Sequence, residues 1–126
     1  MIRAIGRPSR YMTEFSNGKT TSFSDTTLGK GGSGEGFRPH ELLEAALASC
    51  MNMSLRMFAE KHSIPLASVI TTVTLDRSSP NEVCFEYVVD LAGDLTEGDR
   101  RRLLEAVESC PVRHTLSREV VFRTKR

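Results

Sequence analysis

The pattern of hydrophobic and polar positions changes its period several times along this 126-residue chain. Between Leu42 and Phe58, apolar residues occupy almost every face of a helical wheel, which predicts a helix that is buried on most sides. Pro39 suits the first helical position, because its missing N–H would be unpaired there in any case. The sequence therefore predicts a long helix from about Pro39. A helix buried on most sides needs both a sheet and a second helix around it. A chain of 126 residues can barely supply both, which favours a dimer.

Two hairpins are predicted, one on each side of this helix. Residues 10–15 and 20–24 have strand character and flank Asn17-Gly18, a strong hairpin signal. Residues 69–76 and 83–91 alternate between apolar and polar positions, which is typical of paired strands with one buried face. A glycine-rich stretch at residues 29–36 predicts a mobile link between the first hairpin and the helix.

The last third of the chain returns to helical spacing. Thr96 is suited to cap a helix that ends near Cys110, and Pro111 opens a further short helical turn. The predicted buried stripe of the first of these helices consists of Leu103, Leu104 and Val107. Residues 119–124 predict a closing strand. Antiparallel strands around a buried helix indicate the α+β class.

Composition and charge limit what the protein can be. The chain has the length of one domain, residues 1–126, with 26% charged and 39% hydrophobic residues. Its net charge of +1 provides no electrostatic surface for nucleic acid. It has no apolar segment of a length that would predict a signal peptide or a membrane span. Three cysteines, an odd number, favour reduced thiols in the cytoplasm over a disulfide scaffold.

Two of the cysteines have complementary surroundings. Cys50 lies within the apolar helix, and Cys110 stands before Pro111 at a junction between helices. This arrangement suits an attacking and a resolving thiol, although a buried cysteine also serves as a small hydrophobic residue. We interpret Cys84, within a predicted strand, as such a packing residue. His40, His62 and His114 share no ligand spacing, so neither a metal nor another cofactor is expected.

The order of elements and three motifs resemble the OsmC/Ohr family of thiol-dependent peroxide-detoxifying proteins. The motifs are Pro39-His40-Glu41-Leu42-Leu43-Glu44-Ala45-Ala46 leading to Ala48-Ser49-Cys50, then Gly93-Asp94-Leu95-Thr96, and finally Cys110-Pro111-Val112. The resemblance spans essentially the whole chain. It implies an intertwined homodimer in which antiparallel sheets surround long central helices and the active sites lie at the interface.

The resemblance also implies a function. Cys50 would be the peroxidatic thiol and Cys110 the resolving thiol of a peroxidase that reduces organic hydroperoxides, with an external dithiol as reductant. The apolar neighbours Leu47, Met51 and Met53 would favour organic hydroperoxides over hydrogen peroxide. They would also raise the pKa of Cys50, so a nearby cation is expected to offset the desolvation.

One part of the family pattern is missing from this chain. In the peroxidase branches, an arginine from the N-terminal hairpin pairs with a glutamate ten positions before the first cysteine. His40 stands at that glutamate position here, with Glu41 beside it, and the arginine position falls near Ser16. We therefore take His40 and Glu41 as possible supporting residues, and Arg10, Lys19 and Arg38 as candidates for the cation. The alternative is a divergent OsmC-like protein without peroxidase turnover, acting as a small-molecule-binding or redox-sensing dimer.

Overall fold

The structure, a computed structural model, describes residues 1–125 and has the predicted α+β class, with antiparallel sheets and helices. The chain divides into two compact units, which we call the first unit (Met1–Leu43) and the second unit (from Glu44 onward). That residues 1–126 behave as a single domain stays a prediction. Among residues 1–125, no helix is long and apolar enough to cross a membrane.

The first unit contains a three-stranded antiparallel sheet in the order β1-β2-β3. Its strands are β1 (Arg3–Gly6), β2 (Thr13–Ser16) and β3 (Thr21–Ser24). The predicted hairpin is present between β2 and β3, which are both shorter than expected. The sequence did not reveal β1, because its four residues are all exposed and show no alternation between buried and exposed positions.

The turn between β2 and β3 depends on Asn17 and Gly18. The Oδ1 atom of Asn17 accepts hydrogen bonds from the backbone N–H groups of Lys19 and Thr20, at 2.9 and 2.8 Å. Gly18 has a φ angle of 96°, which glycine adopts without the steric cost that a side chain would impose. The Asn-Gly signal therefore has a local physical basis.

The glycine-rich segment after β3, which the sequence predicted to be a mobile link, contains local structure and side-chain hydrogen bonds. It begins with a short 3-10 helix, η1 (Leu28–Lys30). The buried carboxylate of Asp25 accepts hydrogen bonds from the N–H of Thr26 at 2.7 Å, and from the N–H and hydroxyl of Ser33 at 3.1 and 2.6 Å. The Arg38 guanidinium donates to four backbone carbonyls, those of Asp25, Gly34, Glu35 and Gly36. These side chains organise the segment.

Helix α1 (Pro39–Lys61) begins at the predicted proline. The Oε1 atom of Glu41 accepts a hydrogen bond of 2.7 Å from the N–H of Arg38, which satisfies a donor at the start of the helix. This is the contribution that the third helical residue makes in a capping box.

In this single chain, α1 is fully buried on one face and not on most sides as predicted. The buried positions recur every fourth residue: Leu47, Met51, Leu55 and Ala59. Ala46, Met53 and Met57 are exposed, with 49% of Met53 accessible. One chain supplies a hairpin and two shorter helices to pack against α1, and these cover only part of its circumference.

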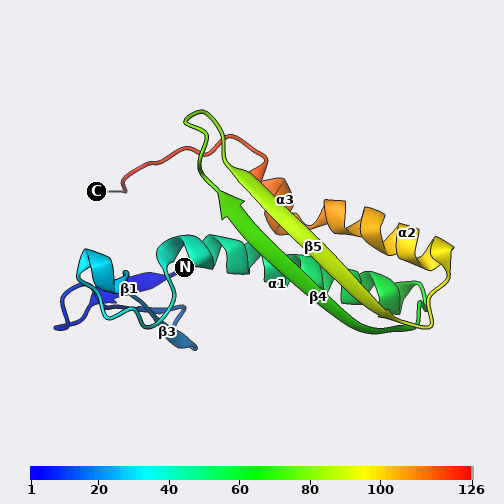
Figure 1. The fold of residues 1–126 in the computed structure, drawn as a ribbon, viewed down its shortest axis with the longest axis horizontal. Helices are drawn as coiled ribbons and strands as arrows, with labels where there is room; N and C mark the ends of the chain where they lie inside the picture. The colour runs from blue at the N-terminus through cyan, green and yellow to red at the C-terminus, as the bar shows by residue number, and fades with distance from the viewer. Residues whose placement is uncertain (126) are drawn as a thin grey trace. The chain divides into compact units, whose positions relative to one another are not determined.

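The second unit contains a long antiparallel hairpin made of β4 (Leu66–Asp76) and β5 (Cys84–Gly93), close to the predicted bounds (Figure 1). Helix α1 runs along β4 and forms three hydrogen bonds with it. Glu44 accepts from the N–H of Leu75 at 2.7 Å, Thr71 donates to the carbonyl of Ala48 at 2.7 Å, and Asn52 donates to the carbonyl of Val69 at 3.1 Å. Two of these bonds satisfy backbone groups of β4, the N–H of Leu75 and the carbonyl of Val69.

Three helical segments follow the hairpin: α2 (Glu97–Ala106), η2 (Val107–Ser109) and α3 (Pro111–Leu116). Thr96 caps α2 as predicted, in a reciprocal capping box with Asp99. Leu103 and Val107 are buried, whereas Leu104 is 46% exposed and does not belong to the predicted buried stripe. The buried apolar residues of the second unit are Leu47, Met51, Leu55, Ala59, Ile64, Leu103, Val107 and Cys110.

The predicted closing strand over residues 119–124 is wrong for this single chain. The structure assigns no strand there, and Val120, Val121 and Phe122 are largely exposed, with Phe122 at 91%. A strand forms only where a neighbouring strand accepts its backbone hydrogen bonds. A short run of apolar residues does not by itself provide that neighbour.

Candidate functional site: a hydrogen-bonded thiol pair

The structure brings Cys50 and Cys110 together, although sixty residues separate them in the sequence. Cys50 lies on α1 and is half-buried, and Cys110 lies immediately before α3 and is fully buried. Both are free thiols, and their side chains form a hydrogen bond with each other. The contact arises because α1 and the junction between η2 and α3 pack in the same apolar core.

The surroundings of Cys50 favour its thiolate. Burial raises the pKa of Cys50, but hydrogen bonds from the Cys110 thiol, the Val112 backbone N–H and the Ser54 hydroxyl lower it, and the net pKa lies below the ordinary value. These three donors stabilise negative charge on the sulfur, and no cation is among the groups that shift its pKa. Val112 belongs to the first turn of α3, and such N–H groups are known to lower thiol pKa values.

The surroundings of Cys110 have the opposite effect. Burial is the largest influence and raises the pKa of this thiol. The hydrogen bond with Cys50 and the charge on Cys50 raise it further, while the backbone N–H groups of Arg113 and Val112 lower it only in part. The pKa values of the two thiols therefore shift in opposite directions, that of Cys50 downward and that of Cys110 upward.

The residues predicted to support the thiols lie in the first unit and have other contacts there. Glu41 accepts the hydrogen bond from the N–H of Arg38 at the start of α1, and His40 is exposed. The guanidinium of Arg38, a candidate for the activating cation, is occupied by loop carbonyls. A catalytic part for His40 or Glu41 stays a prediction.

Sequence reasoning missed the donors that Cys50 uses. Ser54 follows Cys50 by four residues on one helix, so the two side chains share a face, and this spacing could have identified it. The Val112 N–H has no signal in the sequence beyond its place after Pro111. It reaches Cys50 only because α3 packs against α1.

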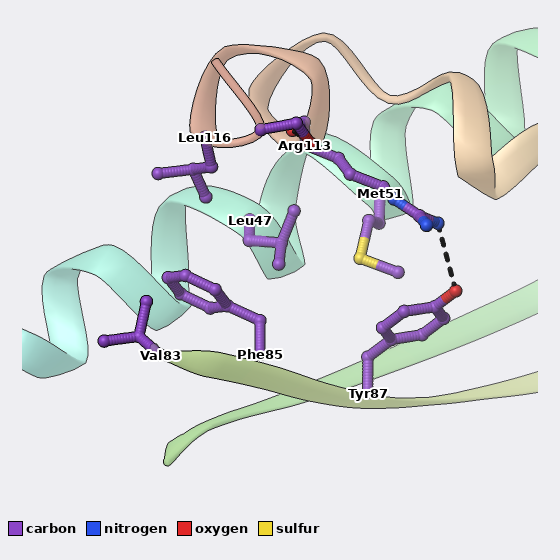
Figure 2. A pocket seen from close by; sticks show the side chains of 8 residues that line it. Leu47, Met51, Val83, Phe85, Tyr87, Arg113 and Leu116 are labelled. Atoms are coloured by element: carbon purple, nitrogen blue, oxygen red, sulfur yellow. Dashed lines mark hydrogen bonds between the residues drawn. The ribbon is translucent and has the colours of Figure 1, made fainter. Parts of the chain in front are cut away.

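A cavity of about 300 Å³ lies in the second unit between α1, β5 and α3 (Figure 2). Its lining residues are Leu47, Met51, Val83, Phe85, Tyr87, Arg113, Leu116 and Ser117. Neither cysteine lines the cavity. Two of its lining residues are sequence neighbours of the thiol site: Met51 follows Cys50 on α1, and Arg113 follows Val112, whose N–H donates to the Cys50 sulfur. The cavity is mostly apolar, and its one charged side chain belongs to Arg113.

The third cysteine and the histidines form no second cluster. Cys84 is exposed at the start of β5. Within residues 1–125, no three His, Cys, Asp or Glu side chains come together in a way that could hold a metal ion.

Comparison with known proteins identifies the family of this chain. The family model described as OsmC-like protein matches residues 32–125, which is most of the chain. The protein therefore belongs to the OsmC-like family. No match is found among curated protein sequences.

Solved structures share the fold at low sequence identity. The OsmC-like protein from Mycoplasma pneumoniae is 18% identical, with a TM-score of 0.78 over 92% of this chain and 85% of that one. An organic hydroperoxide resistance protein OsmC from Legionella pneumophila is 21% identical, with a TM-score of 0.67 over 93% and 88%. The organic hydroperoxide resistance protein OhrB of Bacillus subtilis is 19% identical, with a TM-score of 0.65 over 93% and 89%.

Proposed function

We propose that this protein is a cysteine-based peroxidase that reduces organic hydroperoxides, with Cys50 as the peroxidatic thiol and Cys110 as the resolving thiol. The observation that carries the proposal is the hydrogen-bonded thiol pair with opposite pKa shifts. A peroxidase of this kind needs one thiol that ionises easily and a second, protonated thiol within reach of the first. Structural similarity to proteins named for organic hydroperoxide resistance supports the choice of substrate.

The proposed reaction has three steps. The Cys50 thiolate attacks one oxygen of the hydroperoxide, the O–O bond breaks, and the other oxygen leaves with its organic group as an alcohol after protonation. Cys50 becomes a sulfenic acid. The Cys110 sulfur then attacks the Cys50 sulfur, a disulfide forms, and water leaves. An external dithiol reduces this disulfide by thiol–disulfide exchange and is itself oxidised to a disulfide.

The test is consumption of cumene hydroperoxide by the reduced protein with excess dithiol. We expect sustained turnover by the wild type and by Cys84→Ser, which is the matched control because that thiol lies outside the pair. Cys50→Ser should abolish turnover. Cys110→Ser should retain one rapid oxidation of Cys50 but lose efficient cycling with a dithiol. Wild-type rates in the Cys50→Ser protein would refute the proposal.

A second candidate is a redox-sensing dimer that forms the Cys50–Cys110 disulfide without turnover. The observation in its favour is that Cys50 has hydrogen-bond donors but no cation among the groups that shift its pKa. Stoichiometry separates the candidates. A sensor consumes about one equivalent of hydroperoxide per thiol pair and then stops, even when dithiol remains, whereas a peroxidase continues until the substrate is exhausted.

We further propose that the protein acts as a homodimer through the exposed apolar side of α1. Ala46, Met53 and Met57 are exposed there at helical spacing, and Cys50 lies in the same stripe. A second copy on this stripe would bury these side chains and shield Cys50 from bulk water. Met53→Glu should therefore lower the molar mass measured by light scattering towards that of a monomer.

The matched control for this test is Leu104→Glu. Leu104 is about as exposed as Met53 but lies on α2. Its substitution should leave the molar mass unchanged. A wild type that is already monomeric at micromolar concentration would contradict the dimer, as would a Met53→Glu protein that keeps the wild-type mass.

A further inference from the structure

The cavity between α1, β5 and α3 contains an arginine that has no carboxylate partner among residues 1–125. The Nη1 atom of Arg113 donates to the Tyr87 hydroxyl at 3.2 Å, and its guanidinium carbon lies 5.9 Å from the centre of the Tyr87 ring (Figure 2). Within residues 1–125, the guanidinium has no other hydrogen-bond partner and no ion pair. One bond to a neutral phenol uses only one of its five N–H donors.

The bond to Tyr87 also holds the guanidinium in place. Figure 2 shows the Arg113 side chain extending from α3 towards Tyr87 on β5, with Met51 beside it. A half-buried guanidinium that is already oriented loses less side-chain entropy when it binds an anion. Its planar donors match the two oxygens of a carboxylate.

The remainder of the cavity suits a hydrocarbon chain. Leu47, Phe85 and Leu116 contribute apolar surface, and no acidic side chain is among the lining residues. A volume of about 300 Å³ lies at the lower end of the range for small-molecule sites. An apolar cavity with one cation selects a ligand that has an apolar body and one negative group.

We propose that this cavity binds an amphipathic carboxylate, with the carboxylate on Arg113 and Tyr87 and the hydrocarbon chain against Leu47, Phe85 and Leu116. Cys50 does not line the site, but Met51 follows it on α1 and Arg113 follows Val112, which donates to the Cys50 sulfur. The next step rests on the proposed peroxidase function. Under that function, Arg113 and Tyr87 are specificity-determining residues that favour hydroperoxides bearing a carboxylate over uncharged ones.

The first experiment measures binding alone, by calorimetry with octanoate and with octanol as the uncharged probe. We expect the wild type to bind octanoate more tightly than octanol. Arg113→Met should weaken octanoate binding about tenfold to hundredfold, the range for losing a hydrogen-bonded charge partner, and leave octanol binding unchanged. Arg113→Lys should recover part of the affinity, and Tyr87→Phe should lose a smaller part.

The control is Arg101→Met, which removes an exposed arginine on α2 and should change neither affinity. Equal binding of octanoate and octanol by the wild type would overturn the proposal, and this comparison needs no variant to fold. Unchanged octanoate binding by a folded Arg113→Met protein would overturn it as well.

The second experiment compares turnover of a carboxylated alkyl hydroperoxide with that of tert-butyl hydroperoxide. Arg113→Met should raise KM for the carboxylated substrate and leave KM for the uncharged one unchanged. A wild type that reduces neither hydroperoxide would refute the proposed peroxidase function, while the binding experiment would still decide the carboxylate site. Normal turnover of both without any preference in the wild type would refute the carboxylate site alone.

Discussion

The two units of this protein bury different kinds of groups. In the first unit, the buried side chains are polar: Ser24 and Asp25, the latter 4% exposed. In the second unit they are apolar, and both the fully buried Cys110 and the half-buried Cys50 belong to that environment. The first unit is therefore organised by hydrogen bonds from side chains to backbone, and the second by a hydrophobic core.

This difference decides where thiol chemistry can occur. An apolar core excludes water and raises thiol pKa values, so a few well-placed donors can then set one thiol apart from the other. That is the arrangement around Cys50 and Cys110. The first unit leaves Phe23 and Phe37 42% and 46% exposed, and its described residues include no buried apolar side chain. Three short strands without an apolar cover are marginal by themselves.

The largest effect is expected from the core of the second unit. Leu103 is fully buried and its neighbour Leu104 is 46% exposed, so the pair forms a matched comparison on α2. Leu103→Ala should lower the free energy of unfolding by about 2–5 kcal/mol, because it removes buried surface and leaves a cavity. Leu104→Ala should change it by less than about 0.5 kcal/mol. Urea denaturation measures both, and equal losses would contradict the assignment of the core.

An effect confined to the first unit is expected from Asp25. Hydrogen bonds from Ser33 and then Thr26 hold the pKa of Asp25 below its ordinary value. Asp25→Asn should therefore speed hydrogen exchange at Thr26 and Ser33, with little change in the exchange of α1 core amides. Asp90→Asn, at an exposed position on β5, is the control.

The pH dependence of this effect follows from the direction of the shift. A carboxyl whose folded-state pKa is depressed stabilises the fold fully above the pKa of the unfolded carboxyl, about 3.9. The contribution is lost as the pH falls through the lower, folded-state pKa. Protection at Ser33 should thus fall in acid in the wild type and vary less with pH in Asp25→Asn. Identical acid profiles for the two proteins would exclude this role for Asp25.

The smallest effect is expected from Ser54. Ser54→Ala removes one of the three donors to the Cys50 sulfur, so the pKa of Cys50 should rise. Alkylation of Cys50 by iodoacetamide, followed against pH, should then shift to higher pH. Ser49→Ala is the control, because the Ser49 hydroxyl bonds to the carbonyl of Ala45 on the same helix. A profile that moves equally in both variants would show that Ser54 has no particular role.

Local patterns predicted most of the fold. Pro39, the Asn17-Gly18 turn and Thr96 each act through their immediate neighbours, and the structure has the expected helix start, hairpin and cap. Two of the failures share a different cause. The closing strand at residues 119–124 and the burial of α1 on most sides both needed partners that a single chain does not supply. Strand β1 lacked alternation because both of its faces are exposed.

The sequence by itself determined the α+β class, the family and the choice of Cys50 and Cys110 as candidate site residues, because these depend on periodicity, local capping and short motifs. Only the tertiary structure decided that Cys110, Val112 and Ser54 all donate to the Cys50 sulfur, and that Arg113 meets Tyr87 across a cavity. Hydrogen bonds and desolvation act over a few ångströms in space. Residues 26 or 60 positions apart come within that range only when helices and strands pack around a common core.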